Sequence, residues 1–269
     1  YFLIQRIFET VRDMKTAGKS KREICLALSN IDGAVLPDKS STTKAYNSSD
    51  LNRQILTKGS PFFYGEETAG SGVVRISEGC QFLCSFCAES WQRKPYREAD
   101  ADIIVQKALE LKQNCGFDSI DLYSFNFNMH SQIDKIVMEL SKVFRSVGLK
   151  SQRFDMIARE PGMIEFMSEA GKSSITCGLE GISGRMRNYL CKSLSDEDLM
   201  NSLRAILNSN LRSLKIFIIA TGIETDDDIR EFTELCEFIG SFETKKRIYF
   251  SITPLVRFPH TPLESEPAP

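Results

Sequence analysis

The sequence predicts an α/β fold in which a parallel sheet with helices outside it forms an incomplete barrel. Beyond residue 61, six short apolar runs typical of buried strands alternate with amphipathic helical patterns. Such alternation is typical of βαβ units, whose right-handed crossovers wind a sheet into a barrel or a doubly wound sheet. Because only six units can be found where a complete barrel has eight, we expect a partial TIM-type barrel.

Composition and charge exclude several classes of protein. The chain has 269 residues, 42% of them apolar, which is enough for a large core. The 34 basic and 36 acidic residues nearly balance, so the charge gives no reason to expect a nucleic-acid partner. The longest apolar run, residues 216–220, is far shorter than a membrane span. The first residue is Tyr1, which predicts a piece of a longer protein in which no secretory signal can be read.

The first 60 residues are predicted to be a helical segment and a polar linker. Apolar positions recur at helical spacing in residues 1–30, with a polar break at 15–21 that contains Gly18, so two short helices are expected. Residues 38–50 read DKSSTTKAYNSSD, which is too polar for a core. We therefore divide the chain into residues 1–60, a barrel at 61–255 and a tail at 256–269.

Strands and helices follow in turn along the barrel region. The strands are predicted at 72–77, 119–123, 154–157, 174–179, 214–220 and 248–253. Stop and cap signals mark the helices between them: 103–115 before Gly116, 133–147 before Gly148, one starting at Pro161, one from Ser195 with Asp198, and one from Thr225 with Asp228. No glycine-rich dinucleotide or P-loop motif follows any strand, which excludes nicotinamide and P-loop nucleotide chemistry.

Cysteine usage points to a metal centre. Cys80, Cys84 and Cys87 lie within eight residues, directly after the first predicted strand. The other five cysteines lie mostly in apolar patterns, where a free cysteine is usually a small core residue of a protein in the reducing cytoplasm; they are Cys25, Cys115, Cys177, Cys191 and Cys236.

Three cysteines on one loop leave more than one interpretation open. Closely spaced thiolates favour a soft metal centre. Structural zinc and electron-transfer clusters usually take four protein ligands, so a fourth cysteine from elsewhere would make a non-catalytic metal module. With three ligands, one iron of a [4Fe–4S] cluster keeps an open position for a substrate, which is a catalytic arrangement. An ordinary βα enzyme with incidental cysteines is the third alternative.

The CxxxCxxC spacing, with Phe86 before the last cysteine, resembles the radical S-adenosylmethionine (radical SAM) superfamily over residues 62–263. The resemblance implies that Cys80, Cys84 and Cys87 bind three irons of a [4Fe–4S] cluster and that SAM chelates the fourth. It also implies reductive cleavage of SAM to methionine and a 5′-deoxyadenosyl radical, with an electron donor such as flavodoxin or ferredoxin. Phe86 would pack beside the adenine.

Further stretches resemble the SAM-binding parts of this family. Residues 178–183 (GLEGIS), followed by Arg187 and Lys192, are similar to its "GxE…S…R…K" stretch, which implies that Glu180 meets SAM polar groups and Lys192 pairs with the carboxylate. Both residues are also interpretable as ordinary surface charges. Arg153 is a second candidate for the carboxylate or the substrate. Ser124 and Asn126 stand where the family often has a GGE-type turn.

Two departures from the family signature and one linker segment concern which branch of the family the chain resembles. The fifth strand resembles the family signature but has Ala220 and Gly222 in place of its glycine and proline. Residues 31–37 (IDGAVLP) resemble the segment that joins a cobalamin-binding domain to the barrel. The resemblance implies a cobalamin-dependent methyltransferase acting on an unactivated carbon, with cobalamin bound by a domain outside this chain.

The reaction and the substrate stay open at this stage. The alternatives within the family are a rearrangement, a methylthiolation or an oxidation without cobalamin. Methylthiotransferases carry further cysteines upstream, which Cys25 alone does not supply. We expect an oxygen-sensitive enzyme with a small-molecule or peptide substrate, no membrane and no nucleic-acid partner.

Overall fold

The computed structural model describes residues 2–34, 51–55, 71–149, 151–169 and 172–266. The chain forms two units, residues 1–49 and 50–269. The polar linker at 38–50, part of the cobalamin-linker resemblance and the predicted boundary at residue 60 lie outside the described residues. The predicted division of the chain at residue 60 therefore stays a prediction.

The first unit contains the two predicted short helices. Helix α1 spans Phe2–Thr16 and α2 spans Lys21–Leu28. Gly18 has a φ of 69° in the break between them, a left-handed conformation that glycine adopts without strain. Ser20 and Glu23 form a capping box at the start of α2, in which the Ser20 N–H donates to Glu23 Oε2 at 2.9 Å.

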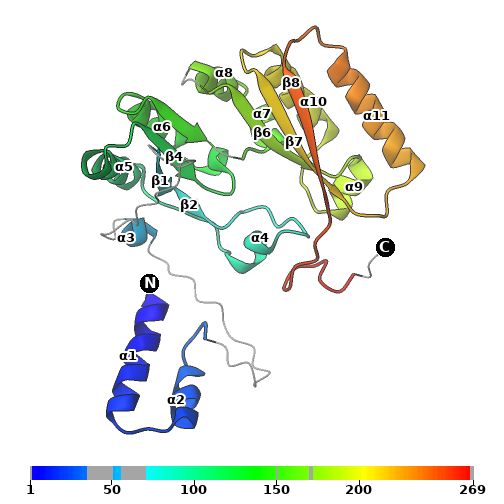
Figure 1. Cartoon of the computed structure of the whole chain (residues 1–269). Helices are drawn as coiled ribbons and strands as arrows, with labels where there is room; N and C mark the ends of the chain where they lie inside the picture. The colour runs from blue at the N-terminus through cyan, green and yellow to red at the C-terminus, as the bar shows by residue number, and fades with distance from the viewer. Residues whose placement is uncertain (1, 35–50, 56–70, 150, 170–171, 267–269) are drawn as a thin grey trace. The chain divides into compact units, whose positions relative to one another are not determined.

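The second unit contains two parallel sheets whose strands follow chain order. The first sheet pairs β1 (Ser71–Arg75), β4 (Ser119–Tyr123) and β5 (Ser146–Leu149). The second pairs β6 (Ser174–Glu180), β7 (Ser213–Ala220) and β8 (Arg247–Pro254). A parallel bridge between Gln152 and Cys177 joins the segment after β5 to β6. Figure 1 shows the strands of both sheets as arrows.

This strand order confirms the predicted partial barrel. Each strand of the two sheets pairs with its neighbour in the chain, whereas a doubly wound sheet reverses its order at a switch point. Within the described ranges β1 and β8 do not pair with each other, so the barrel is open. Helices α5 (Ala101–Cys115) and α6 (Ile133–Ser141) accompany the first sheet; α10 (Asp196–Asn208) and α11 (Asp226–Gly240) accompany the second.

The short elements lie mainly in the loops that follow the strands. They are α3 (Leu51–Ile55), the antiparallel pair β2 (Ser77–Glu78) and β3 (Arg97–Glu98), α4 (Ala88–Gln92), η1 (Phe127–Met129), α7 (Phe154–Arg159), α8 (Gly162–Glu169) and α9 (Gly184–Tyr189).

Alternation along the strands separates a core face from an interior face. In β7, Leu214, Ile216 and Ile218 are buried, whereas Lys215 is exposed and Phe217 is half-buried. Side chains in a strand point to opposite faces in turn, so the first set forms core and the second faces the barrel interior. The same alternation holds in β4 and β6.

Three predictions about these elements are wrong. The third strand is β5, and residues 154–157 belong to helix α7 instead. The helix predicted at 133–147 ends at Ser141. Its last predicted residues belong to β5, in which Val147 and Leu149 are buried and Gly148 between them is half-buried. A Cβ at Gly148 would lie 1.7 Å from Asp121 Oδ1, so this glycine allows strand packing rather than stopping a helix.

The scattered cysteines are also less uniform than predicted. Cys177 is fully buried, Cys25, Cys115 and Cys236 are half-buried, and Cys191 is exposed with a φ of 49°. Only Cys177 is a buried core residue as the pattern suggested. Cys191 lies in the turn after α9. The apolar residues around it in the sequence would fit a helix interior equally well.

Candidate active site

The cluster loop, residues 79–87, joins β2 to α4 just beyond the carboxyl end of β1. Cys80 and Cys84 are buried and Cys87 is half-buried. Ligand sites of parallel α/β folds gather at this edge of the sheet. The three predicted cluster ligands therefore lie where the fold places its chemistry.

The start of the cluster loop is held by a buried carboxylate. Glu78 accepts hydrogen bonds from Arg93 at 3.0 Å and from Arg97 at 2.9 Å. The next residue, Gly79, has a φ of 76°, and a Cβ there would lie 2.5 Å from the Arg93 carbonyl oxygen. Any larger residue at Gly79 would have to move backbone, so the approach to Cys80 is fixed on both sides.

The other half of the cluster loop is tied to the end of α9. The Ser85 N–H donates to the Leu190 carbonyl at 3.0 Å, and the Ser85 hydroxyl donates to the Tyr189 carbonyl at 3.1 Å. Trp91 Nε1 donates to the Cys84 carbonyl at 3.0 Å from helix α4. These contacts fix the loop between the first and second sheets.

Arg153 makes a second link between the cluster loop and the segment after α9. The side chain is 2% exposed, and its guanidinium carbon lies 3.6 Å from the ring centroid of Phe82. Its Nε donates to Asp155 Oδ1 at 2.8 Å and its Nη2 to the Ser193 carbonyl at 3.2 Å. Sequence reasoning placed Arg153 near a strand, whereas it is the N-cap residue of α7.

Glu180 and Lys192 form an ion pair at the end of β6. Lys192 Nζ lies 3.4 Å from Glu180 Oε1, and their side chains are 7% and 16% exposed. Glu180 has a φ of 65° after a bulge in β6. A Cβ on Gly178 would lie 2.0 Å from Glu180 Oε1, so that glycine makes room for the carboxylate. Lys192 is thus buried, and Glu180 is partly buried beside it.

Ser124 and Asn126 follow β4, and Asn126 contacts Cys80. The Ser77 hydroxyl donates to Ser124 Oγ at 3.0 Å, and the Asn126 N–H donates to the same oxygen at 3.1 Å. Asn126 Nδ2 donates to Cys80 Sγ at 3.7 Å. Phe86 is half-buried within the cluster loop.

Charge around Cys84 shows which predicted residues share one neighbourhood. Burial raises the pKa of the Cys84 thiol, and the positive charges of Lys192 and Arg153 oppose that rise. Cys80 and Cys87 are near enough to raise the Cys84 pKa further. The charges of Lys192 and Arg153 thus lie near enough to influence Cys84, although both residues are far from it in the sequence.

The donor set is of the kind that an iron–sulfur cluster takes. Among the described residues, no group of three or more His, Cys, Asp or Glu side chains is placed to hold one metal ion. Cluster cysteines bind different irons, so their sulfur atoms surround a cluster rather than meeting at one ion. Thiolates are the protein ligands that such clusters take, and Cys80, Cys84 and Cys87 would supply three of them.

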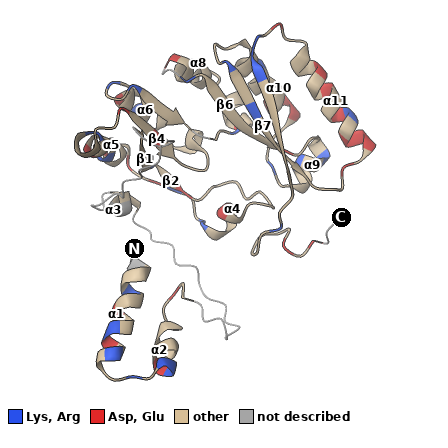
Figure 2. Ribbon diagram, viewed as in Figure 1, with Lys and Arg blue, Asp and Glu red and all other residues tan. Residues whose placement is uncertain are grey.

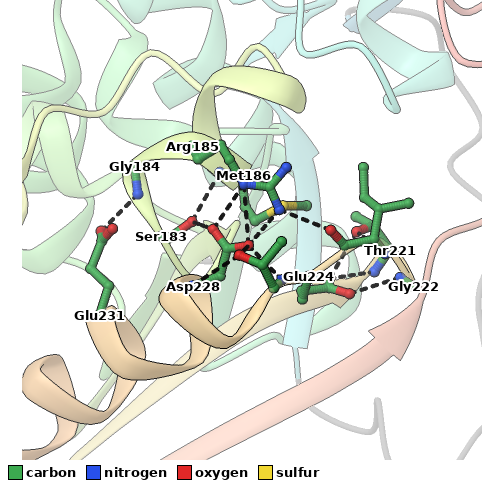
Figure 3. A network of polar contacts seen from close by, with 11 residues as sticks. Ser183, Gly184, Arg185, Met186, Thr221, Gly222, Glu224, Asp228 and Glu231 are labelled. Carbon is green, nitrogen blue, oxygen red and sulfur yellow. Dashed lines mark hydrogen bonds and ion pairs between the residues drawn. The ribbon is translucent and has the colours of Figure 1, made fainter.

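A polar network that sequence reasoning found only in part supports α9 (Figure 3). Ser183 caps α9 and its hydroxyl donates to Asp228 Oδ1 at 2.5 Å. Arg185 pairs with the same carboxylate and donates to the Ile223 carbonyl at 2.8 Å. The sequence predicted the part of this network in which Thr225 and Asp228 cap α11. It did not predict the contacts of Asp228 with Ser183 and Arg185, because these residues are more than 40 positions away.

The network continues along the loop before α11. Glu224 accepts from the backbone N–H groups of Thr221 at 2.7 Å and Gly222 at 2.8 Å. Glu231 accepts from the Gly184 N–H at 2.7 Å (Figure 3). Since α9 carries the carbonyls that hold Ser85, this network also fixes the cluster loop.

No helix in the described part of the chain is long and apolar enough to span a membrane. Acidic residues lie along α11, and basic residues lie on α9, β7 and β8 (Figure 2). Over the whole chain the numbers of acidic and basic residues nearly balance.

Two curated relatives resemble the chain in sequence. An uncharacterised methyltransferase of Pyrococcus horikoshii is 24% identical over 164 residues, which cover 59% of this chain and 35% of the relative. The ribosomal protein uS12 methylthiotransferase RimO of Aliarcobacter butzleri is 25% identical over 224 residues, which cover 78% of this chain and 46% of the relative. The chain thus spans less than half the length of these relatives.

Solved structures share the fold at low sequence identity, and the likeness concerns the fold alone. The radical SAM methyltransferase TsrM of Kitasatospora setae, with cobalamin and a [4Fe–4S] cluster bound, has a TM-score of 0.54 at 16% identity, over 73% of this chain and 39% of TsrM. The cobalamin-dependent radical enzyme OxsB, with aqua-cobalamin and SAM bound, has a TM-score of 0.62 at 15% identity, over 95% of this chain and 42% of OxsB.

A family model settles the assignment that the cluster loop and the strand order suggested. The model of the Radical SAM superfamily matches residues 74–236, which include every strand from β2 to β7 and the whole cluster loop. These residues make up more than half of the chain. The chain belongs to the radical SAM superfamily of enzymes, which use a [4Fe–4S] cluster and SAM.

Proposed function

We propose that the chain is the core of a cobalamin-dependent radical SAM methyltransferase that acts on an unactivated carbon of a small molecule or peptide. Its membership of the superfamily supports an enzyme that cleaves SAM. The likeness of its fold to TsrM and OxsB supports the use of cobalamin, since both were solved with cobalamin bound. The methyltransferase relative of Pyrococcus horikoshii supports methyl transfer.

The observation that carries the proposal is the proximity of the cluster loop to an ion pair between buried Lys192 and partly buried Glu180. SAM ends in an amino group and a carboxylate, and such a ligand needs one anionic and one cationic partner. Lys192 and Glu180 form this pair near Cys84, within the same neighbourhood as the cluster loop. Cys80, Cys84 and Cys87 would hold the cluster, which leaves one iron open to SAM.

Each remaining site residue has an assigned task in this proposal. A bound and reduced cluster would supply the electron for cleavage of SAM into methionine and a 5′-deoxyadenosyl radical. Lys192 would pair with the methionyl carboxylate and Glu180 would accept from SAM polar groups, with Ser124 and Asn126 as further hydrogen-bond partners beside Cys80. Phe86 would pack beside the adenine.

We assign Arg153 to positioning rather than to direct contact with the carboxylate. Its Nε, its Nη2 and one face of its guanidinium already contact Asp155, Ser193 and Phe82. Through these contacts it would hold the cluster loop next to the segment that carries Lys192.

Partners outside this chain complete the proposal. Cobalamin would be bound by a separate domain and would carry the methyl group. Flavodoxin or ferredoxin would supply electrons, and the reducing cytoplasm would keep the free cysteines reduced.

The test is product analysis with the anaerobically reconstituted chain. With dithionite as reductant, we expect SAM to yield 5′-deoxyadenosine, and S-adenosylhomocysteine to form as well when cobalamin and its domain are supplied. Cys84→Ala should abolish SAM cleavage, whereas Cys191→Ala, which removes an exposed cysteine outside the cluster loop, should retain it. Reductive cleavage by the Cys84→Ala variant at the wild-type rate would refute the assignment of the cluster loop.

Methylthiolation is the second candidate because RimO of Aliarcobacter butzleri is similar over 78% of this chain. The two candidates differ in whether sulfur enters the product. A methylated product without added sulfur selects methyl transfer, and a product whose mass increases by a methylthio group selects the alternative.

A further inference from the structure

A basic depression lies at the amino ends of β7 and β8, away from the cluster loop. Its volume is about 370 Å³, and it is lined by Leu211, Arg212, Thr244, Lys245, Lys246 and Arg247. Arg212 directly precedes β7 and Arg247 begins β8, and the Arg247 N–H donates to the Arg212 carbonyl at 3.0 Å. Strand pairing therefore fixes the two guanidinium-bearing residues side by side.

The basic depression gathers four cationic side chains without an acidic side chain in its lining. Within the described ranges, Arg212, Lys245 and Arg247 form no ion pair with another residue. The concentration of charge is local, because the whole chain has a formal net charge of −2. Like charges so close repel one another, and an anion bound among them would remove that repulsion.

Lys246 and Thr244 give the basic depression a defined floor. Lys246 Nζ donates to the carbonyls of Ser209 and Leu211, the latter at 2.7 Å, which fixes the ammonium and leaves one of its three N–H groups for a ligand. Thr244 Oγ1 accepts from the Lys246 N–H at 3.2 Å, so the hydroxyl can donate its own hydrogen outward.

We propose that the basic depression binds a compact, multiply charged phosphate anion, such as pyrophosphate or the polyphosphate part of a larger molecule. Guanidinium groups match phosphate oxygens in a two-pronged geometry. Several charges of one sign in a small volume suit pyrophosphate, whereas the carboxylates of an acidic peptide carry one charge each. No aromatic side chain lines the depression, so it would recognise phosphate rather than a base.

The position of the basic depression separates it from the radical chemistry. Strand β7 has 8 residues and runs from the depression toward the catalytic edge. At about 3.3 Å per residue this is roughly 25 Å, so an anion here is an anchor or an effector and not the reacting molecule. The proposal goes beyond the proposed function and does not depend on it.

Calorimetric titration of the reconstituted chain with inorganic pyrophosphate tests the proposal. We expect one saturable site whose affinity falls as salt is added. The double variant Arg212→Gln/Arg247→Gln should bind at least about tenfold more weakly, because each arginine supplies charge-assisted hydrogen bonds. Arg145→Gln is the matched control: Arg145 is exposed and directly precedes β5, as Arg212 precedes β7, but lies outside the depression.

Three results would overturn the proposal: no saturable binding, equal binding by the double variant, or equal loss in the Arg145→Gln control. A tetraglutamate peptide that binds as tightly as pyrophosphate would overturn the phosphate assignment. The cluster's visible absorbance, recorded before and after titration, shows that pyrophosphate has not removed iron. SAM cleavage by the double variant at the wild-type rate is the expected result, and it keeps this test separate from that of the proposed function.

Discussion

Replacing Arg153 by methionine tests whether this buried cation holds the cluster loop in place. The change removes the contact with Phe82, the bond to the Ser193 carbonyl and the partner of Asp155 in one step. Methionine is a shorter apolar side chain of comparable volume that packs well against an aromatic ring, so little packing volume is lost. The main effect is electrostatic.

The expected loss of stability follows from the carboxylate left behind. The Asp155 side chain is 2% exposed, and removing one partner of a buried ion pair costs about 3–5 kcal/mol. Loss of the stacked cation adds about 1–2 kcal/mol, partly offset by methionine packing. Because one guanidinium makes all these contacts, the terms are not additive, and we expect a total of about 4 kcal/mol.

Anaerobic urea unfolding of four proteins measures this effect: wild type, Arg153→Met, Asp155→Leu and the double variant. Replacing both partners of a buried pair by apolar residues is often nearly neutral, so the double variant should recover at least about 2 kcal/mol over Arg153→Met. It should still lack the link from the cluster loop to Ser193. The electron paramagnetic resonance signal of the reduced cluster and the KM for SAM should therefore stay altered in the stable double variant.

Two outcomes would refute this reasoning. An Arg153→Met variant within about 1 kcal/mol of wild type would mean that the ion pair does not stabilise the fold. A double variant with wild-type cluster spectrum and wild-type KM would mean that Arg153 does not position the cluster loop.

Two further predictions concern the end of β6 and the network at α11. Gly178→Ala places a Cβ 2.0 Å from Glu180 Oε1, so the KM for SAM should rise about tenfold or more with little loss of stability, whereas Gly162→Ala, where nothing lies within 4 Å, should leave KM unchanged. The hydrogen bond from Arg185 holds the pKa of Asp228 well below its usual range. Below about pH 4 the unfolded chain therefore binds more protons than the folded chain, and the free energy of unfolding should fall as the pH falls. Asp228→Asn should be less stable at pH 7 by about 1–3 kcal/mol and should lose less stability between pH 5 and 3, as measured by urea unfolding of the cluster-free chains.

Local signals in the sequence predicted most elements because the deciding interactions are close in the chain. Ser195 caps α10 through the Asp198 N–H, and Thr225 with Asp228 forms the capping box of α11. Gly116 ends α5 in a left-handed conformation with a φ of 71°. Each of these is set by residues three or four positions apart.

Short apolar runs failed where periodicity is ambiguous. Phe154 and Ile157 are both buried and lie three positions apart, which fits one helical turn, but a run of this length also fits a strand. Val147 and Leu149 have the period of a strand, yet Val147 also continues the apolar face of α6 in the sequence. Residues 146–149 form a strand because they pair with β4, and the local sequence carries no signal for that pairing.

The sequence by itself determined the family chemistry: three cysteines on one loop, their spacing, and the alternation that makes a parallel partial barrel. Only the tertiary structure decided how the loop is held and which charges are buried near it. Arg153 and Lys192 have ordinary sequence surroundings. Their burial follows from strand pairing and from contacts between residues about a hundred positions apart, such as Ser85 and Tyr189. Such contacts form because a folded sheet brings the carboxyl ends of its strands together, which chain neighbours alone do not reveal.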